Sequence, residues 1–456
     1  MAAGMTAPAS RPSSDVSAGV GLSGLVGLAL WVILCRNWGA IADALALPGP
    51  HVPLAGPNAA LAAMVFSGMP MVAWSLMVDK VHLRASTGID WANPRPLRDV
   101  IDISITKLAG LWATWSLVGF VYCLCRWYWR GQYLFAMDVI GGLAPLLFIA
   151  AIPYVLWLDR VLVNPRDASW HFGAMLVGRE TYDRAEVANH LRAWAVKGFF
   201  CAFMFSIIPG GFGNIVGMNY SAVLGDPLAL GNALIETMFL VDVQIAMVGY
   251  LLTMKPLDAQ IRSANPYLGG WVAALICYPP FILMGGGGVL DYRTNGAEWT
   301  FWLQGMPVLE WIWVAAMVVL TGIYAWATVA FGLRFSNLTY RGVLTNGPYA
   351  FTRHPAYLSK NTFWWLSTLP FLTTTHSLVD AVRNTVILGL VSGVYFWRAK
   401  TEEAHLLAED AKYREYHAWM AEHGLVTGTL TKIGRMLARG RPRVEPTDSG
   451  AAHPAE

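Results

Sequence analysis

Apolar residues occur along most of the chain in long runs separated by short polar loops. A helix that crosses a bilayer needs about 20 largely apolar residues, and most of the runs approach this length. The last two runs are shorter, and Pro370 and the turn 373–376 between them predict a tight helical hairpin. The pattern predicts an all-α polytopic membrane protein with about ten transmembrane helices, near Leu22–Cys35, Ala59–Val78, Ile105–Cys125, Val139–Leu156, Ala193–Val216, Leu230–Thr253, Leu268–Met284, Val308–Phe331, Thr362–Thr373 and Thr385–Trp397.

The composition supports this class. Of the 456 residues, 55% are hydrophobic and 13% are charged, whereas soluble domains carry about 25% charged residues. The formal net charge of +3 is close to neutral, and the basic residues fall in loops that flank the apolar runs. The sequence therefore predicts a lipid bilayer as partner and excludes nucleic acid.

Lysine and arginine are concentrated in alternate loops, which predicts the orientation because cytoplasmic loops carry the excess of these residues. The other loops hold few basic residues. Both termini are expected in the cytoplasm of a bacterial-type inner membrane, on the side of the loops that contain Lys80, Arg84, Arg95, Arg98, Arg160, Arg166, Arg179, Arg184, Lys255, Arg262, Arg334, Arg341, Arg353 and Lys360.

The five cysteines predict neither a disulfide framework nor a metal site. All of them lie in or beside apolar runs, and Cys123 and Cys125 have no second pair or histidine cluster nearby to complete a tetrahedral site. We interpret them as buried small hydrophobic residues.

The first stretch with candidate chemistry is N-G-P-Y-A-F-T-R-H-P-A-Y-L, residues 346–358. Gly347 and Pro348 force a turn, and Pro355 disfavours helical geometry at His354. Arg353 and His354 are therefore expected on a shaped loop just before the hairpin, at the cytoplasmic face, where they form a plausible rim for a cofactor.

The second stretch, R-A-K-T-E-E-A-H-L-L at residues 398–407, follows the final apolar run directly. The apolar residues beyond it recur at helical spacing, which predicts an amphipathic helix in the membrane interface. These residues are Leu406, Leu407, Tyr413, Tyr416 and Met420.

Together the two stretches resemble the integral-membrane methyltransferases, which include isoprenylcysteine carboxyl methyltransferases and phospholipid N-methyltransferases. The resemblance covers about the last quarter of the chain. It implies S-adenosylmethionine bound between the loop and the helix, and a lipidic or prenylated small-molecule or peptide acceptor that enters from the membrane. The implied cofactor-binding residues are Gly347, Pro348, Tyr349, Arg353, His354, Pro355, Tyr357, Leu358, Glu402 and Glu403.

The sequence departs from this family in three places. Residues 359–361 are Ser-Lys-Asn where many members have a glycine, and Asp410-Ala411 stands where members often have Phe-Gly. The first three hundred residues resemble nothing in the family. The expected organisation is a disordered tail at 1–18, a transmembrane module of unknown role at 19–305, the catalytic domain at 306–424 and a basic disordered tail at 425–456.

Methyl transfer from a sulfonium needs orientation and exclusion of water more than covalent help. Glu402 and Glu403 suit an amino group or ribose hydroxyls, and Arg353 and His354 can donate to a carboxylate. An acceptor carboxylate needs no base and could be oriented by Arg398. An amine or hydroxyl acceptor needs one, with His354 or Glu403 as candidates. The expected catalytic residues are Arg398, His354 and Glu403.

Acidic residues in the run near 230–253 are a second candidate site, because charge within a membrane helix is costly and by default suggests function. Asp242 and Glu236 are candidate substrate contacts, and Lys107 is a candidate partner that would make Asp242 structural. Trp364 and Trp365 beside the hairpin are candidate substrate contacts or interface anchors.

Two other classes of function remain open. Membrane sterol reductases carry a similar Arg-His-Pro-x-Tyr-Leu loop and bind NADPH, although the acidic pair 402–403 favours methyl transfer. A transporter or receptor could be built on the N-terminal spans, although no repeated halves are visible.

Overall fold

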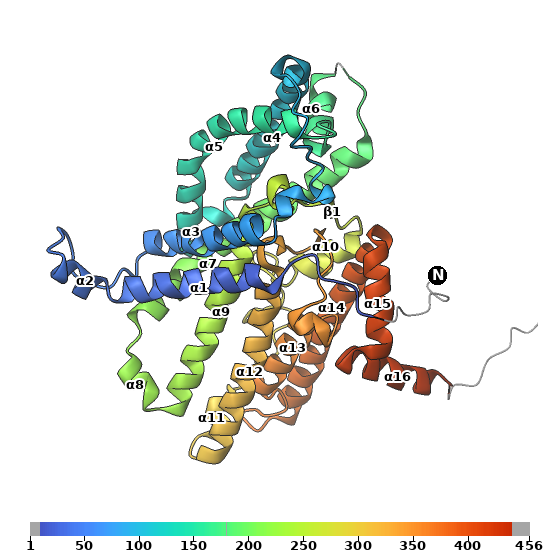
Figure 1. Ribbon diagram of the computed structural model, residues 1–456. Coiled ribbons are helices and arrows are strands. Elements are labelled where there is room, and N and C mark those ends of the chain that lie inside the picture. Colours follow the sequence, from blue (N-terminus) through green and yellow to red (C-terminus); the bar gives the residue numbers. More distant parts are fainter. Residues whose placement is uncertain (1–9, 179, 440–456) are drawn as a thin grey trace, which may run out of the picture.

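The structure is a computed structural model, and it describes residues 10–178 and 180–439 of the chain (Figure 1). Within these residues the fold is all-α, apart from one short antiparallel strand pair, β1 (Ser263–Ala264) and β2 (Thr339–Tyr340). The helices are α1 (Ala18–Arg36), α2 (Trp38–Ala44), α3 (Pro57–Ala73), α4 (Leu97–Cys125), α5 (Leu134–Val161), α6 (Ala168–Val177), α7 (Arg184–Gly217), α8 (Tyr220–Leu224), α9 (Pro227–Leu251), α10 (Leu268–Leu275), α11 (Trp299–Leu303), α12 (Pro307–Phe331), α13 (Pro355–Thr368), α14 (Leu378–Glu409), α15 (Ala411–His423) and α16 (Leu425–Arg439).

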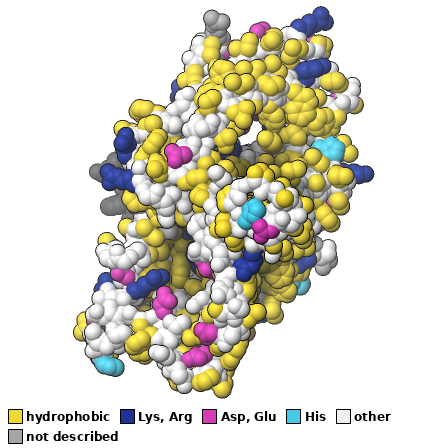
Figure 2. Space-filling model, turned by 90° about the vertical axis from the view of Figure 1, so that its left-hand side faces the viewer, with side chains coloured by type: hydrophobic (Ala, Val, Ile, Leu, Met, Phe, Trp, Pro, Cys, Tyr) yellow, Lys and Arg dark blue, Asp and Glu magenta, His cyan; other side chains and the backbone are white. Residues whose placement is uncertain are grey.

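Eight helical segments in the described part of the chain are long and apolar enough to cross a bilayer. Many large apolar side chains on them face outward, and hydrophobic side chains cover much of the face in Figure 2. The predicted class, a polytopic helical membrane protein, is confirmed at this level. The segments are Ala18–Arg36, Pro57–Val78, Leu97–Cys125, Gly131–Val161, Arg184–Gly217, Pro227–Leu251, Pro307–Arg334 and Leu378–Glu409.

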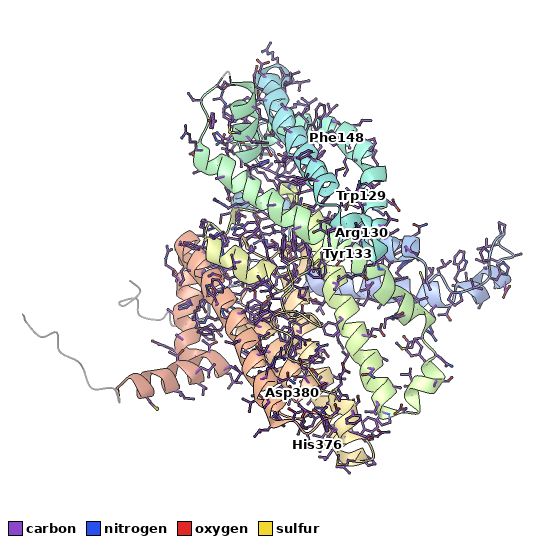
Figure 3. The ribbon with its side chains drawn as sticks, turned by 180° about the vertical axis from the view of Figure 1, so that it is seen from behind. Trp129, Arg130, Tyr133, Phe148, His376 and Asp380 are labelled. Carbon is purple, nitrogen blue, oxygen red and sulfur yellow. The ribbon has the colours of Figure 1, made fainter. Side chains whose placement is uncertain are left out.

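Two of the ten predicted spans are not long helices. In the stretch predicted at 268–284, the helix ends at Leu275, before Pro279 and Pro280. The stretch predicted at 362–373 belongs to α13, whose 14 residues span only about 21 Å, less than the roughly 30 Å of a hydrocarbon core. The last predicted stretch lies within α14, which is 32 residues long. The C-terminal hairpin therefore has one short and one long arm, and Figure 3 shows His376 and Asp380 beside the turn that joins them.

The irregular segment between α10 and α11 packs against α14. Tyr292 is buried in a cluster with Leu388 and Val391 of that helix. Arg383 donates to the carbonyl of Asp291, and Asn384 donates to the carbonyl of Thr294 at 2.8 Å. Because α14 satisfies these backbone groups, non-helical chain is tolerated beside the apolar helices.

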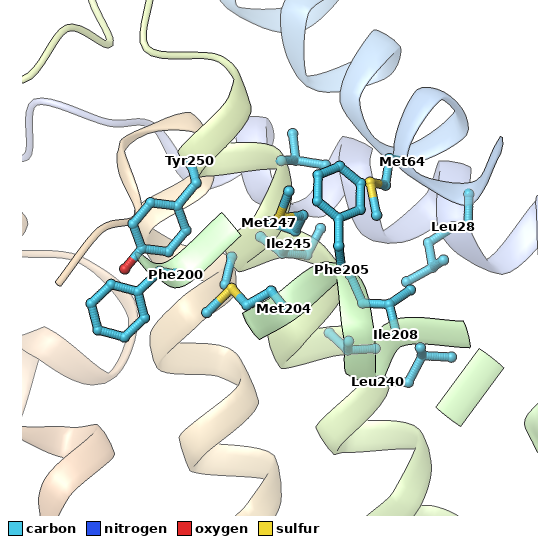
Figure 4. Packing of buried hydrophobic residues seen from close by; sticks show 14 of the residues in the cluster. Leu28, Met64, Phe200, Met204, Phe205, Ile208, Leu240, Ile245, Met247 and Tyr250 are labelled. Carbon is cyan, nitrogen blue, oxygen red and sulfur yellow. The ribbon is translucent and has the colours of Figure 1, made fainter. Parts of the chain in front are cut away.

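Helix α9 forms the centre of the largest core. Its N-cap Asp226 accepts from the backbone N–H of Leu228, and Pro227 occupies its first turn. Nearly every residue from Leu240 to Tyr250 is buried. Figure 4 shows these side chains packed among those of α7, α3 and α1, and α12 lies along another side of α9. The C-terminal helices are therefore anchored to the N-terminal ones through α9.

Both predicted tails contain ordered structure. Residues 1–9 and 440–456 lie outside the described residues. Residues 10–17 run beside the C-terminal region, where Asp15 accepts from Val343 N at 2.8 Å and pairs with Lys412 at 2.5 Å. Residues 425–439 form helix α16. Disorder is therefore not the state of residues 10–17 or 425–439.

The predicted amphipathic helix is broken in two. Helix α14 runs on to Glu409, and Asp410 then caps α15 by accepting from Lys412 N. The apolar face of α15, with Tyr413, Tyr416 and Met420, is buried against Tyr340 and Val343. It covers protein and does not lie free for the membrane interface, because the loop before the Gly-Pro turn occupies that face.

A buried carboxylate ties three loops together beside this region. Asp258 is 1% exposed and accepts from Ser86 at 2.8 Å, from Arg262 at 3.3 Å and from Arg334 at 2.5 Å. Arg334 is itself only 4% exposed. Buried charges of this kind are tolerated only when they are paired and hydrogen-bonded.

We expect Asp258→Ala to lower the free energy of unfolding by about 3 kcal/mol, because it leaves the buried Arg334 without its closer counter-ion and with only Asp15, at 3.6 Å. The control is Asp43→Ala, since Asp43 is 70% exposed and, within residues 10–178 and 180–439, pairs with His51 alone; its change should stay within about 0.5 kcal/mol. The measurement is thermal unfolding of both variants in detergent. Equal shifts would contradict the assigned role of Asp258.

Candidate functional site

The loop before α13 has the shape that its sequence predicts. Gly347 has a φ of +56°, and a Cβ there would lie 3.2 Å from the Trp326 side chain, so both backbone and space favour glycine. Pro348 is buried in a single helical turn that ends at Ala350. Pro355 begins α13, where its missing N–H costs nothing.

This loop meets α14, although the two are separated by more than forty residues in sequence. His354 Nε2 lies 2.9 Å from Glu403 Oε1. The Tyr357 hydroxyl donates to Glu402 Oε1 at 2.5 Å. The two stretches singled out in the sequence therefore form one site.

Glu403 is the hub that holds the loop in place. It is 4% exposed and gathers Arg353 at 3.3 Å, Lys400 at 2.7 Å and His417 at 3.9 Å, besides His354. Its oxygens are occupied by these partners, and its side chain does not line the cavity. The geometry makes it a positioning residue.

A cavity opens between this loop, α12, the segment before the loop, α14 and α15. Glu402 is its carboxylate at the α14 wall, while Tyr324 and Tyr395 form an aromatic part of the lining. Among the predicted site residues, those that line it are Tyr349, Arg353, His354, Tyr357, Arg398 and Glu402.

Arg398 is fully engaged by protein. It is 1% exposed, and it donates to Asn337 Oδ1 at 2.5 Å, Glu402 Oε1 at 3.3 Å and Tyr278 OH at 3.4 Å. Its guanidinium also lies over the Tyr357 ring. Arg398 thus fixes the cavity wall, and a ligand would have to share donors that already have partners.

Arg353 is different, because it has spare donors. Its Nε and Nη1 atoms are buried and make no hydrogen bond within the described structure. Nε lies 3.3 Å from Glu403 Oε1 as an ion pair, without hydrogen-bond geometry. Buried donors without partners are rare and costly, and Arg353 lines the cavity, so it is suited to a ligand that carries an anionic group.

Lys360, which the distribution of basic residues marks only as cytoplasmic, lines the cavity. Its ammonium lies 5.2–5.7 Å from the ring centroids of Tyr324, Trp364 and Tyr395. No carboxylate of the described residues lies within salt-bridge distance. The sequence does hold one indication of this position: Lys360 lies three residues after Tyr357, and residues three apart share a helix face.

Asp242 lies behind the cavity wall. It accepts from Thr328 and Tyr324, and both of these residues line the cavity. The predicted pairing with Lys107 is wrong: Lys107 pairs with Asp159 and, at 3.1 Å, with Asp167. The sequence could not show this, because the partners lie 52 and 60 residues further along the chain.

The remaining predicted residues lie outside the cavity lining. Glu236 accepts from Asn214 at 2.5 Å. Trp365 donates to Ser392, and Trp364 packs edge-on against Tyr395, so both join α13 to α14. The others are Gly347, Pro348, Pro355 and Leu358, which shape or flank the loop.

Metal ligation finds no support in the described part of the chain, where no three His, Cys, Asp or Glu side chains are placed to hold an ion. Comparison with protein-family models, curated proteins and solved structures finds no match for this chain.

We expect Glu403→Gln to speed amide hydrogen exchange in residues 347–354, because it removes the charge that holds Arg353 and His354. Glu409→Gln is the control on the same helix, since Glu409 is 38% exposed and its one ion pair among the described residues is a 3.8 Å contact with His405. Exchange is measured by mass spectrometry of peptides from both variants. Unchanged exchange of the loop in Glu403→Gln would refute the hub role.

Proposed function

We propose that this protein is a membrane enzyme that transfers a methyl group from S-adenosylmethionine to a lipidic or prenylated acceptor. The observation that carries the proposal is the meeting of the 346–358 loop with Glu402 and Glu403 of α14 around one cavity. The family resemblance of the sequence requires this meeting, and nothing in the local sequence alone produces it.

The residues at the cavity fit the cofactor. Arg353 has unpaired buried donors for its carboxylate. Glu402 offers a carboxylate oxygen for its amino group or ribose hydroxyls. The tyrosine rings lining the cavity exclude water and present π faces, which attract cations. When bound, S-adenosylmethionine supplies an activated methyl group, so the protein needs to orient two ligands more than to activate either.

The acceptor side of the cavity favours an acidic group. Lys360 carries a positive charge among aromatic rings and has no carboxylate partner within salt-bridge distance in the described residues. A carboxylate acceptor needs no general base, and this matters because His354 is already held by Glu403. The closest activity is therefore carboxyl O-methylation of a prenylated cysteine.

A rival proposal is an NADPH-dependent reductase of sterols or isoprenoids. The observation that favours it is the excess of cationic over acidic side chains in the cavity, since phosphates also suit arginine and lysine. Glu402 opposes it, because a carboxylate repels phosphate. No described feature of the N-terminal helices specifically favours a transporter or receptor.

The cofactor proposal is tested by calorimetric binding of S-adenosylmethionine, S-adenosylhomocysteine and NADPH to detergent-purified protein. We expect the adenosyl ligands to bind, and Arg353→Gln to weaken them roughly 10- to 100-fold through loss of a charged hydrogen bond. Arg166→Gln is the control, because Arg166 is 52% exposed, lies outside the cavity lining, and contacts Glu180 and the Trp170 ring. Binding of NADPH alone would replace the proposal with the reductase.

The acceptor proposal is tested with S-farnesylcysteine that bears a free or an esterified carboxylate. Radiolabelled methyl transfer should occur only to the free acid, and Lys360→Met should raise its KM more than it lowers kcat. If the adenosyl ligands bind but no methyl group is transferred to the free acid, the acceptor proposal is wrong and the cofactor proposal is unaffected.

We propose that the site faces the cytoplasm of a bacterial-type inner membrane, with both termini inside. The basic loops support this orientation. Ten crossings require two more passages besides the eight long helices: the chain from α10 to α11, and α13 together with the turn after it. Figure 1 shows α10 and α11 well apart along the molecule.

This orientation places the turn after α4 outside. Cys123 and Cys125 there are exposed, so the interpretation of all five cysteines as buried is wrong for these two. A membrane-impermeant maleimide should therefore label Cys125 in intact spheroplasts. The Cys123→Ser, Cys125→Ser double variant should lose the label. Labelling that requires permeabilised membranes would reverse the orientation.

A further inference from the structure

Helix α16 presents an apolar face that no other described part of the protein covers. Leu425, Leu430, Ile433 and Met436 are 70%, 60%, 48% and 71% exposed. The last three recur at intervals of three residues and so share one side of the helix. Figure 1 shows α16 extending outward from α15, away from the bundle.

The charge of this segment indicates what covers that face. From Leu425 to Val444 the sequence has five basic residues and no acidic one, namely Lys432, Arg435, Arg439, Arg441 and Arg443. Lys432 is exposed. An amphipathic helix with an exposed apolar side and only positive charge is complementary to a bilayer surface that contains anionic lipid.

The start of α16 is joined directly to the loop at the cavity. Val426 N donates to the carbonyl of Phe351 at 3.2 Å, and Arg353 N donates to Thr427 Oγ1 at 3.3 Å. Thr427 is buried at this junction. Phe351, itself 50% exposed, adds another apolar side chain to this junction. An anchor on α16 would therefore restrain the segment that carries Arg353 and His354.

We propose that α16 docks on the anionic surface of the same bilayer that holds the long helices, and that docking orders the loop 351–354 at the cavity. The apolar side chains enter the interface while Lys432 lies among the lipid headgroups. The lipid composition of the membrane then sets how rigidly one wall of the cavity is held. This inference does not depend on which reaction the cavity supports.

The test uses the full chain, one copy per nanodisc, in phosphatidylcholine alone or mixed with phosphatidylglycerol. Amide hydrogen exchange is followed in residues 428–436 and 349–354. We expect both segments to exchange more slowly in the anionic discs. In the anionic discs, Lys432→Glu should speed exchange of residues 428–436 by about fivefold, because it reverses one charge near the surface. Raised salt should act in the same direction.

Ile433→Asp should abolish the difference between the two lipids in both segments, while Ile433→Leu, which keeps the apolar face, should retain it. Equal exchange in neutral and anionic discs would overturn the proposal. Protection that appears only when two copies share a disc would also overturn it, by assigning the face to a second copy. Lipid-dependent protection of α16 with no change in the loop would refute the coupling.

Discussion

The ion pairs of one buried carboxylate, Asp258, hold together the loops beside the cavity. Asp258 links the loop after α3, through Ser86, to the end of α12, through Arg334. Taking these charges out of water costs several kcal/mol per ion unless they stay paired. Any of these segments that moved alone would leave a buried charge behind. The segments are thus held together. Arg334 also lines the cavity, so the same ion pairs fix that part of the cavity wall.

The need to pair buried charges also gives Glu402 and Glu403 different roles. Adjacent positions on a helix point about 100° apart, so Glu402 lines the cavity while Glu403 turns inward. Glu403 meets several cationic groups and builds the loop, whereas Glu402 shares its carboxylate with Tyr357 and Arg398 and remains at the cavity. One carboxylate thus holds the loop in place and the other is left for a ligand. Arg353 pairs with Glu403 and also lines the cavity, and it carries buried donors without a hydrogen-bond partner.

An apolar surrounding also limits where the chain can leave helical form. A helix satisfies its own backbone, so eight long helices need no partner for that purpose. The segment between α10 and α11 pairs only part of its backbone within itself, and Arg383 and Asn384 of α14 donate to two of its remaining carbonyls. Side chains of α14 thus satisfy backbone carbonyls at Asp291 and Thr294 in this non-helical segment.

The class of protein, most of the helices and the shape of the Gly347–Pro355 loop follow from the sequence alone, because apolar run length and the backbone limits of glycine and proline act locally. The resemblance to the integral-membrane methyltransferases, not local physics, predicted that this loop meets Glu402 and Glu403. The tertiary structure alone decided the partners of Lys107 and Asp242, the place of Lys360 at the cavity, and the burial of α15 beside an uncovered α16. Those outcomes depend on which distant segments share a face, and charge or apolarity in one segment does not specify the segment that it will meet.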